Sequence, residues 1–133
     1  MAEESGVRLR PVAVADEDAQ RTEFHFALDT QAGEFLGVAG ISSFDSVNRR
    51  ANLGYWVRSG RTGRGVATSA VGQLAEWAFE NTDVTRLEIV VAVENRASLR
   101  VAEKAGAARE GVLRKRLVLG GRTHDAVMLS LTR

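Results

Sequence analysis

The chain contains no cysteine and a single proline, and only 6% of its 133 residues are aromatic. The absence of cysteine excludes disulfides, thiolate metal ligands and a cysteine nucleophile. No apolar run approaches the roughly 18 residues that a membrane-spanning helix needs. The start, Met1-Ala2-Glu3-Glu4, is acidic and therefore unlike a signal peptide. We expect a cytoplasmic protein with no membrane partner.

Neither sign of charge dominates, since 18 Lys and Arg residues face 17 Asp and Glu residues. Hydrophobic residues make up 44% and charged residues 26%, which is typical of a globular protein, and the length predicts a single domain over residues 1–133. A basic cluster near the C-terminus is typical either of the solvated face of an edge hairpin or of a nucleic-acid patch, and the near-neutral total charge disfavours the patch. This cluster comprises Arg109, Arg114, Lys115, Arg116 and Arg122.

The first half of the chain has the pattern of strands joined by turns. Apolar and polar residues alternate, as at Phe24, Phe26 and Leu28, where one face of a strand is buried. Pro11 ends the first strand-like segment. Residues 15–20 fit either one helical turn or a loop. The predicted strands span residues 7–11, 23–28, 35–41 and 51–57, with a turn at 29–34 and a polar loop at 42–50.

The second half alternates helices with strands. Two segments have apolar residues at helical spacing, and Gly106 after the second fits a left-handed cap. The β-branched run between them is apolar on both faces toward its end, as in a central strand. Gly120-Gly121 predicts a hairpin. The sequence therefore predicts an α+β fold with a central strand–loop–helix–strand–helix unit, with helices at 66–79 and 98–105 and strands at 86–93, 113–119 and 123–131.

A glycine loop, Gly63-Arg64-Gly65, lies between a predicted strand and a predicted helix. A loop that leads into a helix points backbone N–H groups and the positive end of the helix dipole at one spot, which predicts an anion site. A P-loop would need Gly-Lys-Ser/Thr, and a dinucleotide fingerprint would need glycine where Thr68 stands. On these residues alone, a turn that only reverses the chain is equally open.

Several motifs in order give the loop a context. They are Leu53-Gly54-Tyr55-Trp56-Val57, Gly63-Arg64-Gly65-Val66-Ala67-Thr68, Val93-Glu94-Asn95-Arg96-Ala97-Ser98, Ala102-Glu103-Lys104-Ala105-Gly106 and Gly121-Arg122-Thr123-His124-Asp125. Together they resemble the GNAT superfamily of acetyltransferases, and most of all its RimJ/RimL-like branch, which acetylates the N-termini of ribosomal proteins. The resemblance is strongest over residues 23–133. It implies a mixed, mostly antiparallel sheet and acetyl-CoA as cosubstrate, with no metal.

The resemblance also implies a site. The strand ending at Val57 would splay from its parallel neighbour ending at Val93, and the pantetheine arm would lie in the gap. Asn95 would bond the arm, or only cap the next helix. Ser98 would protonate the leaving thiolate, or be an ordinary first-turn serine. The arm would be bound by the backbone of Trp56, Val57 and Arg58, and the pyrophosphate by the amides of Gly63, Gly65, Val66, Ala67 and Thr68, with the charge of Arg64.

The sequence departs from the family at the catalytic base and at the front. Where relatives carry an acid, this chain has Asn52 and Leu117, and Thr62 replaces the usual Gln or Arg of the loop. Only residues 12–22 stand where the family places its front helices. These helices are therefore shortened or absent, which leaves an open acceptor site, or residues are missing between Gln20 and Arg21. The candidates for the catalytic base are Glu23, His25, His124 and Asp125. A structural role is favoured for both histidines.

The predicted function is direct transfer of acetyl from acetyl-CoA to a primary amine, either a protein N-terminus or a small molecule. One alternative is a catalytically silent acyl-CoA-binding or regulatory domain, suggested by Asn52 and Leu117. The other is a nucleic-acid-binding module that uses the basic cluster, which the near-neutral charge disfavours. Exposed strand edges would also suit a homodimer.

Overall fold

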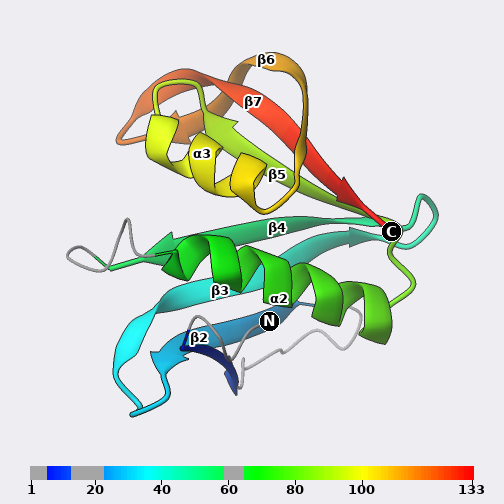
Figure 1. Ribbon diagram of the computed structural model, residues 1–133. Helices are drawn as coiled ribbons and strands as arrows, with labels where there is room; N and C mark the ends of the chain where they lie inside the picture. Colours follow the sequence, from blue (N-terminus) through cyan, green and yellow to red (C-terminus); the bar gives the residue numbers. More distant parts are fainter. Residues whose placement is uncertain (1–5, 13–22, 59–64) are drawn as a thin grey trace.

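The computed structural model describes residues 6–12, 23–58 and 65–133 (Figure 1). The strands form one sheet in the order β1-β2-β3-β4-β5-β7-β6, and every neighbouring pair is antiparallel except β4 and β5. This confirms the predicted mixed, mostly antiparallel sheet. The elements are β1 Val7–Val12, β2 Phe24–Thr30, β3 Phe35–Asp45, β4 Arg50–Val57, α2 Val66–Asn81, β5 Arg86–Ala92, α3 Arg96–Lys104, β6 Ala108–Leu119 and β7 Arg122–Thr132.

Both described helices, α2 and α3, lie on the same face of the sheet, in front of it in Figure 1. We call this the helix face and its opposite the open face. The core lies between the helices and the sheet, where the stripe predicted for α2 is buried at Val71 and Leu74. Its largest fully buried sheet side chains are Leu28, Ile41, Leu53, Leu87, Ile89 and Leu129. Neither α2 nor α3 is both long enough and apolar enough to cross a membrane.

Several element boundaries differ from the sequence prediction, those of β3 and β6 by the most. The pairing of β3 with β4 continues through a bulge to Asp45 and Arg50, which shortens the predicted polar loop. α3 begins at Arg96, because Asn95 caps it. β6 begins at Ala108, five positions before the predicted start at residue 113; Arg109, Glu110 and Gly111 lie exposed on this edge strand and show no apolar alternation. The helical turn considered at 15–20, and the question of missing residues between Gln20 and Arg21, lie outside the described residues.

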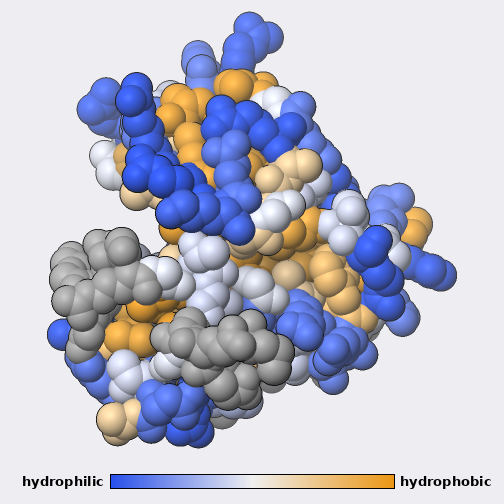
Figure 2. Space-filling model, viewed as in Figure 1, coloured by the Kyte–Doolittle hydropathy of each residue, from blue (hydrophilic) through white to orange (hydrophobic). Residues whose placement is uncertain are grey.

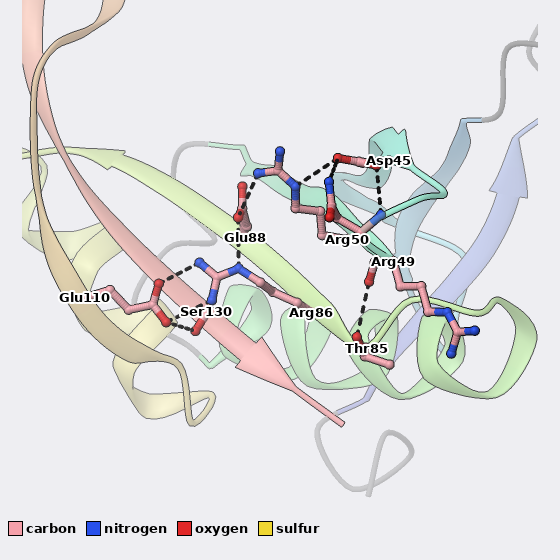
Figure 3. Close-up of polar contacts among 9 residues, drawn as sticks. Asp45, Arg49, Arg50, Thr85, Arg86, Glu88, Glu110 and Ser130 are labelled. Carbon is pink, nitrogen blue, oxygen red and sulfur yellow. Dashed lines mark hydrogen bonds and ion pairs between the residues drawn. The ribbon is translucent and has the colours of Figure 1, made fainter.

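The parallel pairing of β4 with β5 is short. It covers Arg50 with Arg86, Ala51 with Leu87, and Asn52 with Glu88. Ion pairs cross the sheet at the same place (Figure 3): Arg50 Nη1 lies 3.4 Å from Glu88 Oε2, and Arg86 Nε lies 2.8 Å from the same oxygen. We call this part of the junction the closed end.

The charged network of the closed end extends beyond β5. Arg86 Nη1 donates to Glu110 Oε2 of β6 over 2.9 Å, and the Ser130 hydroxyl of β7 donates to the same oxygen over 2.7 Å. These hydrogen bonds hold the pKa of Glu110 at about 2, with Arg86 as the larger cause. At the other edge of the network, Arg50 Nε lies 3.2 Å from Asp45. The network therefore ties β3 to β6 across the point where β4 and β5 meet.

Candidate active site

Beyond the closed end, β4 and β5 separate. β4 continues to Val57 and β5 to Ala92, but neither pairs with the other past Asn52 and Glu88. Their C-terminal ends point apart in Figure 1, and the surface is hollowed between the two halves in Figure 2. The structure therefore has the splay that the family resemblance implied. Over this stretch, the edge of β4 that faces β5 offers backbone groups that a strand-like ligand would satisfy.

The N-terminus of α2 lies on the side of the molecule where the two strands separate (Figure 1). Its first residue follows Gly65, which has φ of 74° and no side-chain cap for the helix. A Cβ added to Gly65 would meet nothing within 4 Å, and the first turn carries no acidic residue. Positive φ favours glycine here, and a helix start that no side chain caps suits an anion. Val66, Ala67 and Thr68 form that first turn, whereas Thr62, Gly63 and Arg64 lie outside the described residues.

A tyrosine and a serine meet across the splay on the helix face. The Tyr55 hydroxyl of β4 donates to the backbone oxygen of Ser98 in α3 over 3.0 Å, and lies 2.9 Å from the Ser98 hydroxyl. Because the backbone oxygen can only accept, the Ser98 hydroxyl is left to donate to Tyr55. Burial raises the pKa of Tyr55, and the hydrogen bond with Ser98 lowers it in part. The pair thus holds protons above neutral pH beside the splayed strands.

Tyr55 was not among the residues that the sequence predicted for the site. A signal was present, because Tyr55 shares the strand alternation of Leu53, which faces the core. The tyrosine therefore points to the helix face, toward the start of α3. What the alternation could not supply was the partner, which lies 43 positions later in the chain.

Asn95 is the N-cap of α3. Its side-chain oxygen accepts a hydrogen bond of 3.1 Å from the backbone N–H of Ser98. This is the capping role that the sequence analysis kept open, and it fixes Ser98 in the first turn of α3. The contact of Asn95 with a pantetheine arm stays a prediction.

The remaining residues predicted to bind the arm lie at the end of β4. Trp56 is 54% exposed and pairs across the sheet with Val38, which is 43% exposed. Arg58 is tied to β3: its backbone N–H donates to the oxygen of Leu36 over 2.9 Å, and its guanidinium to the oxygen of Phe35 over 3.1 Å. The end of β4 is therefore held against β3 while its other edge stays open.

Two of the candidates for a catalytic base have structural partners. His124 Nδ1 lies 2.6 Å from Glu94 Oε1, and this hydrogen bond lowers the pKa of Glu94. The Asp125 carboxylate accepts a 2.9 Å hydrogen bond from the backbone N–H of Lys115 inside a bulge of β6. The first contact ties β7 to the turn between β5 and α3, and the second holds the hairpin of β6 and β7 together. They support the structural role that was favoured for His124.

The other candidates, His25 and Glu23, lie at the start of β2. His25 Nε2 is 3.3 Å from Glu23 Oε1, and the His25 side chain is 41% exposed. Asn52, where relatives carry an acid, lies on the open face opposite Ser42, and Leu117 is paired with His124 in the hairpin. Among the described residues, no group of His, Cys, Asp and Glu side chains has an arrangement that would hold a metal ion.

The basic cluster lies along the edge strand β6 and the start of β7. Arg109 lies 3.3 Å from Glu103 of α3. Arg114, Lys115 and Arg116 form the bulge of β6 opposite Asp125, and Arg122 follows the hairpin turn. These side chains are exposed, as expected for the solvated face of an edge hairpin.

Comparisons with known proteins agree with this geometry. A family model described as the acetyltransferase (GNAT) domain matches residues 3–108. The chain is 37% identical over 99 residues to the putative ribosomal N-acetyltransferase YdaF of Bacillus subtilis, which covers 74% of this chain. Its fold is similar to that of the microcin C7 self-immunity acetyltransferase MccE in complex with acetyl-CoA and AMP, with a TM-score of 0.77, 26% identity and 84% of this chain covered.

A second similar structure is that of RimL, a ribosomal L7/L12 α-N-protein acetyltransferase in complex with coenzyme A. Its TM-score is 0.76 at 25% identity, and 83% of this chain is covered. The chain spans 54% of the length of YdaF, 61% of MccE and 62% of RimL. Each of these relatives is thus considerably longer than the chain described here.

Proposed function

The chain belongs to the GNAT acetyltransferase family, and from that premise we propose that it transfers acetyl directly from acetyl-CoA to a primary amine. The observation that carries the proposal is the splay of β4 from β5 beside the N-terminus of α2. An open strand edge suits an amide-bearing arm, and the helix start suits a pyrophosphate. The structures of MccE and RimL, described as complexes with acetyl-CoA and coenzyme A, support the same cosubstrate.

The residues present fit acetyl-CoA at both of these positions. The space above Gly65, and the absence of a capping side chain or an acid in the first turn of α2, leave room for a phosphate group. We assign the pyrophosphate to the amides of Gly65, Val66, Ala67 and Thr68, together with Gly63 and Arg64. The arm is assigned to the backbone of Trp56, Val57 and Arg58, with Asn95 on the opposite side of the splay. Acetyl-CoA supplies a thioester, which is activated toward amines.

The Tyr55–Ser98 pair provides the acid side of the reaction. Its hydroxyls lie 2.9 Å apart, and the raised pKa of Tyr55 keeps its proton in place at neutral pH. We assign Ser98 as the donor to the departing thiolate and Tyr55 as the group that orients it. A backbone N–H near Val57 is assigned to the developing oxyanion.

The amine acceptor belongs to one of two sources. The printed names of YdaF and RimL point to ribosomal protein N-termini, and a small-molecule amine is the alternative. A catalytically silent acyl-CoA-binding domain is the second candidate function, because Asn52 and Leu117 stand where relatives carry acids. A nucleic-acid-binding role for the basic cluster stays disfavoured by the net charge of +1.

Binding is tested by thermal unfolding with acetyl-CoA and with CoA. A ligand at about 100 times its Kd stabilises a fold by about 2.7 kcal/mol, so the melting temperature should rise. Gly65→Asp and Gly65→Asn form a matched pair, because both side chains tolerate positive φ and only Asp brings a charge that repels phosphate. We expect Asp to abolish the shift and Asn to keep a part of it.

Transfer is tested by thiol release with a panel of amines. Release that requires both the amine and acetyl-CoA supports the acetyltransferase, and its loss in Ser98→Ala supports the assigned donor. A thermal shift without release from any amine supports the silent domain instead. If neither acetyl-CoA nor CoA shifts the melting temperature, the proposed function is wrong.

A further inference from the structure

On the open face, two glycines opposite each other on β3 and β4 leave a gap between the side chains, which runs from His25 of β2 to the splayed edge of β4. In the sheet register, His25 of β2 is opposite Gly40 of β3, and Gly40 is opposite Gly54 of β4. Neither glycine carries a side chain, so the floor of the strip is backbone. We call these three positions the glycine strip. It ends at the edge of β4 that β5 leaves unpaired.

Side chains flank the strip on both sides. The register pair next to it in one direction is Val38 with Trp56, both exposed and apolar. The pair in the other direction is Ser42 with Asn52. Alternation along each strand places all of these side chains on the open face, with the glycines between them. The strip is therefore a narrow path with one apolar wall and one polar wall.

The imidazole of His25 leans over this path. A Cβ added to Gly40 would lie 2.9 Å from His25 Nδ1 and 3.4 Å from Cε1, so the ring occupies the space that a larger residue would fill. The other ring nitrogen, Nε2, lies 3.3 Å from the Glu23 carboxylate. A carboxylate accepts hydrogen bonds, so in the neutral ring Nε2 carries the proton and Nδ1 is the acceptor. Within the described residues, no donor to Nδ1 is present.

We propose that the glycine strip receives the acceptor amine and that His25 Nδ1 takes a proton from its ammonium group. This inference rests on the proposed function. Neighbouring strands lie about 4.8 Å apart, so a ring above Gly40 is about one strand spacing from β4 and about two from an arm bound at its open edge, a span that the amine and a bridging water fill. The acceptor enters on the open face, whereas Tyr55 and Ser98 act from the helix face. The two proton-handling groups thus lie on opposite sides of the splayed strands.

The protons of the reaction balance with these assignments. The acceptor arrives as an ammonium ion with three protons, and His25 takes one of them. The freed lone pair forms the C–N bond to the acetyl carbonyl carbon, and the C–S bond breaks. The thiolate takes the proton of the Ser98 hydroxyl. A second proton from the nitrogen then restores that hydroxyl, and the third proton stays on the amide nitrogen. His25 then releases its proton to water.

The strip also limits the class of acceptor. A backbone floor between Trp56 and Asn52 admits a slender chain, so we expect a primary amine whose carbon carries at least one hydrogen. The N-terminus of a peptide that begins with a small residue and a linear diamine share this chemistry. Amines on fully substituted carbons do not fit.

The closing experiment compares the two histidines. His25→Gln should lower kcat by about a hundredfold or more, the usual contribution of a general base, and leave the thermal shift with acetyl-CoA unchanged. The matched control is His124→Gln, since His124 of β7 is paired with Glu94 in the turn between β5 and α3. His25→Ala should regain part of its activity when imidazole is added, which a purely structural role would not allow. Glu23→Gln should lose less, about tenfold.

The floor is tested separately with Gly54→Val. A Cβ at Gly54 would meet only the Asn52 amide, at 3.8 Å, so the fold accepts a side chain there. We expect a higher KM for the amine with an unchanged thermal shift. Three acceptor amines are compared: a peptide that begins with serine, 1,4-diaminobutane and tert-butylamine. Transfer to either of the first two amines that is lost in His25→Gln supports the glycine strip as the acceptor site. The amine that reacts shows whether the acceptor is a peptide N-terminus or a small molecule.

Three outcomes overturn the inference. One is an active protein whose His25→Gln variant equals the unmutated chain. Another is transfer to tert-butylamine as fast as to the serine peptide or 1,4-diaminobutane. The third is a protein that binds acetyl-CoA and transfers to no amine, which removes the proposed function as well and is therefore distinguishable from the first two.

Discussion

The two ends of the β4–β5 junction are made from the same strands and do opposite things. At the closed end, three register pairs and the network of Arg50, Glu88, Arg86 and Glu110 hold the strands together. At the open end, Tyr55 and Ser98 form a polar contact across the gap on the helix face. The closed end satisfies its backbone and charged groups internally, whereas the open end leaves backbone groups for a ligand.

The open end can separate without loss of order because each strand is held on its outer edge. β4 keeps its pairing with β3 as far as Val57, opposite Gly37, and β5 keeps its pairing with β7 as far as Ala92, opposite Ala126. In each half of the sheet, the splayed strand therefore keeps the backbone pairing with its outer neighbour. Stability is therefore concentrated at the closed end of the junction and binding capacity at the open end.

The largest effect that would sharpen this comparison is expected from Leu87→Ala. Leu87 is fully buried on β5 and lies opposite Ala51 at the closed end. The cavity left behind should cost about 2–5 kcal/mol of unfolding free energy, measured by urea denaturation. The folded fraction should still bind acetyl-CoA. Val90→Ala, a half-buried residue on the open face of the same strand, is the control with a smaller loss. A loss in Leu87→Ala no larger than in this control would contradict the assignment of stability to the closed end.

A smaller effect, on rate and not on folding, is expected at the open end from Tyr55→Phe. The substitution removes one hydroxyl but leaves that of Ser98, so we expect kcat to fall about tenfold, or about 1.4 kcal/mol. The melting temperature should change little. Because the hydroxyls lie 2.9 Å apart, Tyr55→Phe combined with Ser98→Ala should cost less than the sum of the single changes. Strict additivity of the two losses would show that they do not act as a unit.

The sequence predicted those parts of the molecule that local patterns encode. The buried stripe of α2, at Val71 and Leu74, repeats every three to four residues, and this period alone predicts a helix. Gly65 before it belongs to the loop for which an anion site was predicted, and its φ of 74° is one that glycine adopts readily.

Contacts between distant residues could not be predicted in this way. Tyr55 meets Ser98 across 43 positions, and Arg86 meets Glu110 across 24. The position of His25 above Gly40 depends on the register of β2 with β3, and a shift by one residue would turn the ring to the other face. The sequence prediction missed the early start of β6 because an exposed edge strand lacks a buried face. Local pattern therefore predicts the elements, while the site depends on their register.

The smallest effect is expected from the charges of the closed end. Arg86, and to a lesser degree Ser130, lower the pKa of Glu110 from its ordinary 4.5 to about 2. A carboxylate with a lowered pKa stabilises the fold above its unfolded pKa, and this contribution disappears as the pH falls from about 4.5 to about 2. The melting temperature of the unmutated chain should therefore exceed that of Glu110→Gln at neutral pH by a small margin, because water screens the pair, and the two should converge over this window.

Ser130→Ala provides the control for that titration. It removes the second cause of the lowered pKa and leaves Arg86 in place, so the loss of stability on acidification should begin at the same pH as in the unmutated chain but end at a higher pH and be smaller in total. Glu110→Gln should retain part of its acid sensitivity, because Asn48 also holds the pKa of Asp45 at about 2. A difference between the unmutated chain and Glu110→Gln that stays constant from neutral pH to pH of about 2 would mean that the ionised network does not stabilise the closed end. The strands would then be held there by the buried pairing of Leu87 and Ala51 alone.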